Sequence, residues 1–308
     1  MPVAVDSPVI IPLSDAERNS GNIADDHLFD AVDALFKDGV VVLQNAIDVE
    51  VIDKLNEKMK EDTAKILGGA VKGIHWNQGA DKGNVSQVPP ILEEYMFPQV
   101  YANKLAASVL SCVLGPQPEL HYIRSNTLLG NTETRQKVHK DVRGRHLSHP
   151  YAIAQNICLI DVTPENGSTE LWLGTNNSSP WTDHEAMHLG FVAENKLEER
   201  RKIRPPVYTP VKKGSLILRD LRLWHAGMPN HTEETRVMLA FVYFASWYRN
   251  TMKQKFPRSL KPTIEAMEKE SNTKIVVEYV DNEEVKDYLS VEFQTLFTSP
   301  HHPNQEVA

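Results

Sequence analysis

The stretch Thr235–Phe244, TRVMLAFVYF, decides the fold that we predict for this chain. Apolar side chains alternate through it at Val237, Leu239, Phe241 and Tyr243. Residues two positions apart lie on the same face of a β-strand, so this spacing predicts a strand with one continuous apolar face.

Several other short runs upstream have the same β-like texture, and turn residues separate them. Many short strands with Gly, Pro and Asn turns are typical of a β-sandwich or a jelly-roll barrel. The runs are HYIRSNTLL (121–129), YAIAQNICLIDV (151–162), STELWLG (168–174) and GSLILRD (214–220).

Before this β region the apolar spacing is helical. Residues 25–38 predict a helix that stops at Gly39, a second helix follows Asp48 as its N-cap, and a third covers residues 97–115. Between the last two lies a loop, residues 68–90, that is rich in Gly, Asn and Pro.

The chain is expected to contain one folded domain. Residues 1–22 form an arm, residues 23–300 the domain, and residues 301–308 a tail. Within the domain, the helical part reaches about residue 117 and the β core spans about 118–250. Additional helical and strand segments follow at the C-terminal end.

Composition excludes several classes of protein. The net charge of −8 argues against nucleic acid as a partner, because general nucleic-acid binders are basic. Two cysteines, Cys112 and Cys158, make no disulfide framework and favour a reducing compartment. The sequence shows neither a secretory signal nor an apolar run long enough to span a membrane, so we expect a cytoplasmic location and no membrane partner.

The segment HEAMH, residues 184–188, matches the zinc-peptidase pattern H-E-x-x-H. That pattern requires two histidines one turn apart on a helix. The preceding residues, NNSSPWTD (176–183), favour a loop, and Phe191 stands where the longer metzincin pattern has glycine. A zinc-dependent hydrolase therefore remains only an alternative, and a polar segment on a short helix is the simpler interpretation.

A second set of possible metal ligands, His139, Asp141 and His225, fits a metal site better than HEAMH does. His139 and Asp141 would share one side of an extended segment, and His225 follows the strand-like run GSLILRD. Two histidines and one carboxylate from separate strands form the facial triad of non-haem Fe(II) oxygenases, which leaves three positions for co-substrate and O₂.

Arg236 is a candidate for the cation that such an oxygenase needs to bind its co-substrate. Many of these enzymes use 2-oxoglutarate, whose distal carboxylate requires a buried cation. A guanidinium is suited to this because it is permanently charged and binds carboxylates with two parallel hydrogen bonds. Arg236 opens the apolar strand eleven residues after His225 and is our candidate for this clamp.

These motifs together resemble the phytanoyl-CoA dioxygenase (PhyH) family, in particular its fungal secondary-metabolite branch. The resemblance rests on Gln136 with HKD (139–141), on DVTPENGSTELWLGTNN (161–177), and on RLWHAGMPN (222–230) followed by Arg236. It implies a mainly β fold with flanking helices around a double-stranded β-helix (jelly-roll, cupin-like) core. It also implies Fe(II), 2-oxoglutarate and O₂ as cofactors and co-substrates, and oxidation of a small molecule with release of succinate and CO₂.

The resemblance extends to individual residues. His139, Asp141 and His225 match the family's iron ligands and Arg236 its co-substrate clamp. Gln136 and Thr169 match positions near the co-substrate, and Asn126 and Asn156 are weaker candidates for it. Strand pairing or turn hydrogen bonds are the alternative role for these four polar residues. Asn177 departs from the family, which often has histidine there. Related halogenases lack the carboxylate found here at Asp141, so oxygenation, desaturation or rearrangement is expected.

The remaining expectations concern the substrate and the assembly. Our candidates for the substrate pocket are His75, Trp76, Asn77, Trp247 and Tyr248, and core packing is the alternative role for the aromatic residues among them. A jelly-roll protein that binds ligands without turnover is a further alternative, and fungal relatives suggest a homodimer. Two basic clusters could attract an anionic substrate, or could be solvated surface: Lys137, Lys140, Arg143 and Arg145, and Arg200, Arg201, Lys202 and Arg204.

Overall fold

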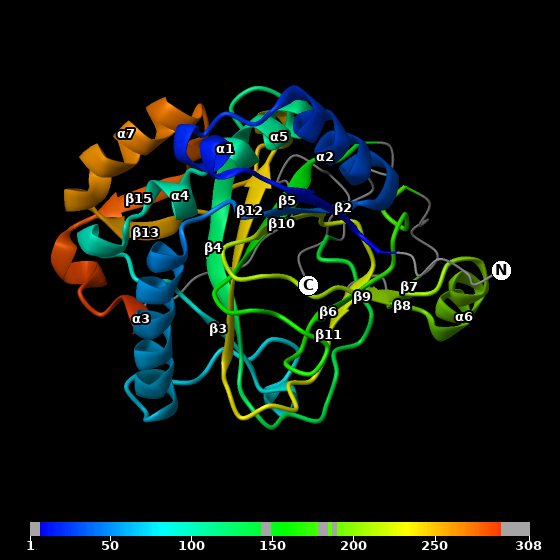
Figure 1. The fold of residues 1–308 in the computed structure, drawn as a ribbon. Helices are drawn as coiled ribbons and strands as arrows, with labels where there is room; N and C mark the ends of the chain where they lie inside the picture. Colours follow the sequence, from blue (N-terminus) through cyan, green and yellow to red (C-terminus); the bar gives the residue numbers. More distant parts are fainter. Residues whose placement is uncertain (1–6, 143–148, 178–183, 187–189, 291–308) are drawn as a thin grey trace.

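The structure, a computed structural model, describes residues 7–142, 149–177, 184–186 and 190–290. A large mixed sheet forms its centre, and helices cover one face of that sheet (Figure 1). A small sheet lies against the other face, where the side chain of Arg236 reaches the backbone of Gly167.

The large sheet has the strand order β1-β2-β10-β5-β12-β4-β14, with β3 also paired to β4. Its strands are β1 (Val9–Pro12), β2 (Val40–Gln44), β3 (Asn84–Gln87), β4 (Glu119–Leu128), β5 (Ala152–Cys158), β10 (Leu216–Asp220), β12 (Arg236–Phe244) and β14 (Lys274–Ile275).

Three smaller sheets complete the β structure, with the orders β11-β6-β9, β13-β15 and β7-β8. Their strands are β6 (Thr169–Leu171), β7 (His184–Ala186), β8 (Phe191–Val192), β9 (Val207–Tyr208), β11 (His225–Gly227), β13 (Gln254–Pro257) and β15 (Val277–Val280). The large sheet and the sheet β11-β6-β9 form the two layers of the jelly roll that the strand pattern predicts.

The helices are α1 (Asp15–Ser20), α2 (Asp25–Asp38), α3 (Val49–Leu67), α4 (Pro98–Tyr101), α5 (Lys104–Leu114), α6 (Glu194–Ile203) and α7 (Lys261–Ser271). Gly39 ends α2 in the left-handed conformation, with φ of 78°. The single helix predicted over residues 97–115 is instead two, because the chain turns at Ala102 and Asn103 caps α5 through the backbone N–H of Ala106.

Strand β12 lies at the centre of the large sheet, between β4 and β5, and all nine of its residues are buried. Val237, Leu239, Phe241 and Tyr243 belong to the main hydrophobic core, together with residues of α2, α3 and α5. The alternation in the sequence therefore marks the face that packs on the helices. The intervening residues, beginning with Arg236, face the opposite side, where the site described below is built.

Two expectations about irregular segments were wrong. The predicted arm contributes an edge strand, because β1 pairs in parallel with β2 and Ile11 enters the core. The predicted loop at residues 68–90 contains β3, which pairs with β4 from Asn84 to Gln87. Strands of only four residues give a weak signal in the sequence, and these two form through pairing with longer partners.

Among the described residues, no helix combines the length and the apolarity that crossing a membrane requires.

The pairing of β1 yields a testable prediction about stability. Ile11 is 2% exposed, and replacing it with alanine should lower the free energy of unfolding by about 2–5 kcal/mol through lost burial and a residual cavity. Its neighbour Ile10 is 41% exposed and serves as the matched control, with an expected change within about 0.5 kcal/mol for Ile10→Ala. Urea unfolding followed by circular dichroism measures both, and equal effects of the two changes would show that β1 is not docked in the sheet.

Candidate functional site

Backbone pairing brings His139 and His225 side by side. Each residue donates its backbone N–H to the carbonyl of the other, at N···O distances of 2.9 and 3.0 Å. Because directly opposed residues in an antiparallel pair point to the same face, the two imidazole rings come together, with their centroids 4.3 Å apart. Residues 86 positions apart in the sequence are thus held in one cluster.

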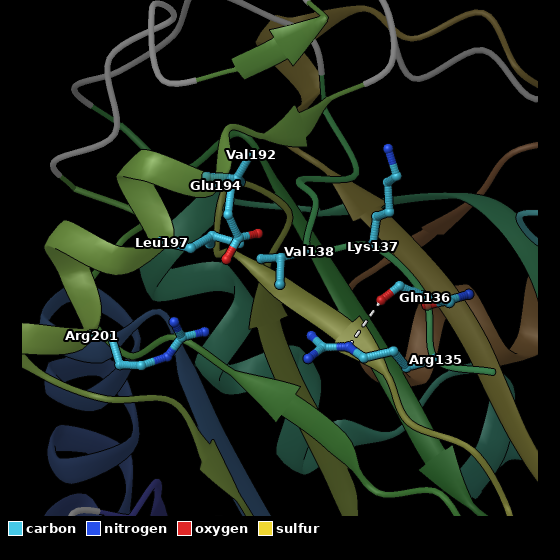
Figure 2. Close-up of a pocket in the computed structure, with 8 residues that line it drawn as sticks. All are labelled: Arg135, Gln136, Lys137, Val138, Val192, Glu194, Leu197 and Arg201. Carbon is cyan, nitrogen blue, oxygen red and sulfur yellow. Dashed lines mark hydrogen bonds between the residues drawn. The ribbon is translucent and has the colours of Figure 1, made fainter. Parts of the chain in front are cut away.

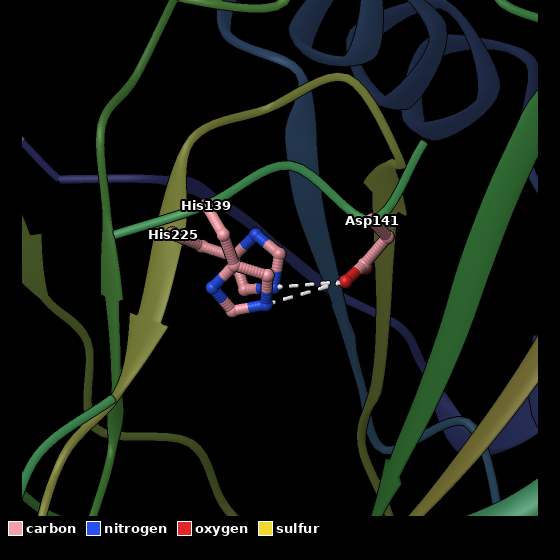
Figure 3. Close-up of side chains that lie close together, drawn as sticks. All are labelled: His139, Asp141 and His225. Carbon is pink, nitrogen blue, oxygen red and sulfur yellow. Dashed lines mark ion pairs between the residues drawn. The ribbon is translucent and has the colours of Figure 1, made fainter. Parts of the chain in front are cut away.

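Asp141 completes this cluster from two residues beyond His139. Its Oδ1 atom lies 3.4 Å from Nε2 of His139 and 3.5 Å from Nε2 of His225. One possible ligand atom from each residue lies within 4.8 Å of the others, and Figure 3 shows the three side chains converging on one point. Two imidazoles and a carboxylate are the donor set preferred by non-haem Fe(II), so the residues present fit that metal.

Backbone carbonyls orient the two imidazole rings. Nδ1 of His225 lies 3.0 Å from the carbonyl oxygen of Leu223, and Nδ1 of His139 lies 2.9 Å from that of Lys137. A carbonyl only accepts hydrogen bonds, so these contacts place the ring proton on Nδ1 and leave the lone pair of Nε2 for a metal.

The local charges favour the protonation states that metal binding requires. Burial tends to raise the pKa of Asp141, but the neighbouring imidazoles and the permanent positive charge of Arg219 outweigh it and hold that pKa well below its usual range. Burial, reinforced by Arg219, also lowers the pKa of His225 well below its usual range. An ionised carboxylate and a neutral imidazole are the ligand forms of these groups.

Arg236 is a buried cation with unused hydrogen-bonding capacity. Its side chain donates to the carbonyl oxygens of Asn126, at 3.3 Å, and Gly167, at 3.1 Å, while Nε has no partner among the described residues. Burial lowers its pKa to about 10, so the guanidinium remains charged at neutral pH. No carboxylate in the described part of the chain pairs with it, so the site suits an anionic ligand.

Gln136 and Thr169 both lie beside Gly227 of β11. The Oε1 atom of Gln136 accepts a hydrogen bond from the backbone N–H of Gly227 at 2.8 Å, and Thr169 pairs in register with the same glycine. A Cβ atom at Gly227 would approach Gln136 Oε1 to 2.8 Å, so glycine permits this close contact.

Asn126 and Asn156 differ in their surroundings. The side chain of Asn126 accepts a hydrogen bond from Asn77, and its carbonyl accepts one from Arg236. Asn156 is buried and donates to the carbonyl oxygen of Leu239 on the neighbouring strand at 3.2 Å, which is a contact within the sheet.

The predicted pocket residues of the long loop lie alongside β3. Trp76 bridges to Val85, and the backbone of His75 and Asn77 is hydrogen-bonded to this strand. This pairing carries the next residue, Gln78, to His139: its Nε2 atom lies 3.1 and 3.2 Å from the two ring nitrogens. The loop therefore does reach the site, through Asn77 and Gln78.

The other two predicted pocket residues lie in a helical turn after β12, Ser246–Tyr248. Tyr248 is buried and stacks on Tyr151 with ring centroids 4.3 Å apart, whereas Trp247 is half-exposed. The structure thus gives Tyr248 a packing contact and places Trp247 at the surface.

Sequence reasoning missed two residues that touch the cluster, Arg219 and Gln78. Arg219 donates to Oδ2 of Asp141 at 2.6 Å from a buried position on β10. Its signal in the sequence was a charged residue inside the apolar run GSLILRD. Gln78 could have been suspected from its place directly after the three pocket candidates.

The zinc-peptidase segment does not have the backbone that its pattern requires. Residues His184–Ala186 form strand β7, not a helix, and His188 lies outside the described residues. Among the residues that the structure describes, the one group of three or more potential metal ligands is His139, Asp141 and His225.

A pocket of about 370 Å³ lies between α6 and the segment that leads to His139 (Figure 2). Both arginines that line the pocket form ion pairs within the chain: Arg135 pairs with the buried Glu170 at 2.7 Å, and Arg201 pairs with Glu198. The pocket is lined by Arg135, Gln136, Lys137, Val138, Val192, Glu194, Leu197 and Arg201.

The two basic clusters are only partly accessible for a substrate. Lys140 is buried, and Arg143 and Arg145 lie outside the described residues. In the second cluster, Arg200 donates to a backbone carbonyl and Arg204 pairs with the buried Asp38 at 2.5 Å.

Comparisons with known proteins show which family and which solved structures this chain resembles. A model of the phytanoyl-CoA dioxygenase (PhyH) family matches residues 35–238, which include the three clustered residues and Arg236. EctD from S. alaskensis, solved with 2-oxoglutarate and 5-hydroxyectoine, aligns with a TM-score of 0.58 and 19% identity, covering 80% of this chain and 83% of that chain.

Two further solved structures share the fold at a similarly low sequence identity. AviO1 from Streptomyces viridochromogenes Tue57 has a TM-score of 0.52 and 17% identity, covering 70% of this chain and 93% of that chain. The α-ketoglutarate-dependent epimerase SnoN from nogalamycin biosynthesis has a TM-score of 0.55 and 18% identity, with coverage of 72% and 84%.

The geometry predicts one divalent metal ion per chain, held by the cluster. In anaerobic calorimetric titrations with Co(II), Asp141→Ala and His225→Ala should each weaken binding by more than about 100-fold, which exceeds the effect of losing a hydrogen-bond partner of a ligand. His184→Ala is the matched control and should bind as the wild type does. Loss of binding in the His184 variant alone would place the metal at HEAMH instead.

Proposed function

Because the chain belongs to the phytanoyl-CoA dioxygenase family, we propose that it oxidises a C–H bond of a small organic molecule in secondary metabolism. As a member of that family it is a non-haem iron dioxygenase that uses Fe(II), 2-oxoglutarate and O₂. In the overall reaction one oxygen atom of O₂ enters succinate and CO₂ leaves. The substrate is oxidised by two electrons, and the other oxygen atom enters it as a hydroxyl group or is released as water. The convergence of Nε2 of His139, Oδ1 of Asp141 and Nε2 of His225 carries the proposal.

These three atoms would hold one face of the iron and leave the opposite face for co-substrate and O₂. Bound Fe(II) supplies the activation of O₂ that no protein side chain can provide. The residues contribute a fixed geometry, since the backbone pairing and the carbonyls of Leu223 and Lys137 set the direction of both rings.

Arg236 would bind the distal carboxylate of 2-oxoglutarate. Its two backbone hydrogen bonds hold the guanidinium in place, and its buried charge has no counter-ion in the described part of the chain. A carboxylate would satisfy the charge and the open Nε–H together. We further assign Gln136, Thr169 and Asn126 to the walls of the co-substrate site. Asn156, already bonded within the sheet, is the weakest of these candidates.

The loop that carries His75, Trp76, Asn77 and Gln78 would cover the iron and exclude water from it. Its contacts with Asn126 and His139 support this assignment. A closed, dry site protects reactive species from side reactions.

Several chemical outcomes remain open to this site. Because related halogenases lack the carboxylate that Asp141 supplies here, we propose hydroxylation, desaturation or oxidative rearrangement. The epimerase SnoN shares this fold, which supports a range of outcomes wider than hydroxylation. We also propose that the protein is a cytoplasmic homodimer.

Visible absorption spectroscopy under anaerobic conditions tests this function. Addition of Fe(II) and then 2-oxoglutarate should produce a charge-transfer band that requires both, and Arg236→Ala should weaken 2-oxoglutarate binding by about 100-fold or more, because one partner of a buried ion pair is lost. Arg258→Ala, at an exposed ion pair, is the matched control and should leave the band unchanged.

Two results would contradict the proposal. Absence of the band in the wild type would exclude the co-substrate site. A normal band without succinate formation in air, across a screen of substrates, would favour a jelly-roll protein that binds its ligands without turnover.

A further inference from the structure

We propose that Arg219 is a positioning residue that decides which oxygen of Asp141 binds the metal. The inference rests on the proposed function, because it concerns the same metal site. Arg219 is 6% exposed and lies on β10, outside the three ligands and the co-substrate clamp.

The two oxygens of Asp141 have separate partners. Oδ2 accepts a hydrogen bond of 2.6 Å from Nη2 of Arg219, whereas Oδ1 faces Nε2 of both histidines at 3.4 and 3.5 Å. Charge-assisted hydrogen bonds of this length are among the stronger ones in proteins. Arg219 therefore holds Oδ2 away from the metal and leaves Oδ1 as a single ligand atom, so the carboxylate binds through one oxygen and not two.

The same guanidinium also lies against His225. Its Nη1 atom is 3.1 Å from Nδ1 of this histidine. Arginine has no acceptor, so once Nε2 of His225 binds a metal, the Nδ1 proton can go only to the carbonyl oxygen of Leu223, at 3.0 Å. The planar group thus fills the space behind two ligands and limits how far either can tilt.

The sheet explains how an arginine reaches this place. On β10, Leu216 and Leu218 belong to the core beneath the helices, so Arg219 projects to the opposite face. Its partner in register on β5 is Ala154, whose small side chain leaves room for the guanidinium. An unpaired arginine would be costly here, and Asp141 provides the counter-charge.

This role predicts a defined change when the arginine is replaced. Arg219→Gln removes the charge and the fork, which frees Oδ2 to approach the metal. The affinity for Co(II) should fall about 10–100-fold, the range expected when a partner of a metal ligand is lost. The visible d–d bands of the Co(II) protein should also change in position and intensity, because a second carboxylate oxygen alters the coordination number.

Arg219→Lys provides a graded second variant. Lysine keeps the positive charge but lacks the planar fork, so it cannot hold Oδ2 and buttress His225 together. We expect a Co(II) affinity between those of the wild type and the glutamine variant, again with a shifted spectrum. This variant also keeps the test decisive if the glutamine variant fails to fold.

Arg204→Gln is the matched control. Arg204, which follows the last residue of α6, likewise pairs with a buried carboxylate, that of Asp38 at the end of α2, at 2.5 Å. Arg204→Gln should lower the melting temperature of the metal-free protein, as we also expect for Arg219→Gln. It should leave the Co(II) affinity and spectrum at wild-type values.

The outcomes separate this inference from the proposed function. A wild-type protein that binds no Co(II) would overturn the proposed function itself. Normal binding by the wild type, with unchanged affinity and spectrum in the folded Arg219 variants, would overturn the inference alone. Reduced affinity with a shifted spectrum, absent from the Arg204 variant, would establish it.

Discussion

The mutual hydrogen bonding of His139 and His225 is the constraint on which the site depends. Two backbone hydrogen bonds, of 2.9 and 3.0 Å, join a segment beyond β4 to strand β11 and put both imidazoles on one side. Asp141 then reaches the same point because it is two residues further along. A slip of one residue in this pairing would turn a ring to the opposite face and remove a ligand from the cluster.

Charge balance inside the jelly roll follows from the same arrangement. Asp141 and Arg219 neutralise each other, whereas Arg236 is a buried cation without a counter-ion in the described residues. A divalent iron and a dianionic co-substrate cancel each other in charge, so binding both leaves the net charge of the interior unchanged. Binding also gives Arg236 its missing carboxylate. The protein is therefore suited to taking up the two together.

The sequence predicted those features that have a local pattern. The alternation of Val237, Leu239 and Phe241 marked the central strand, and spacing together with resemblance pointed to the metal ligands and Arg236. Features that arise only from tertiary pairing escaped it. Strand β1 forms because β2 offers an edge, and Arg219 acquires its role only because β10 lies beside the segment carrying Asp141. The expectation of a short helix at HEAMH was also wrong, since the backbone at His184–Ala186 is a strand paired with β8.

The most direct test of the account is a crystal structure grown anaerobically with Mn(II), which replaces Fe(II) without reacting, and 2-oxoglutarate. The account predicts one ion bound by Nε2 of His139, Oδ1 of Asp141 and Nε2 of His225, with the distal carboxylate of 2-oxoglutarate on Arg236. An ion held elsewhere, or a co-substrate whose distal carboxylate does not contact Arg236, would contradict it.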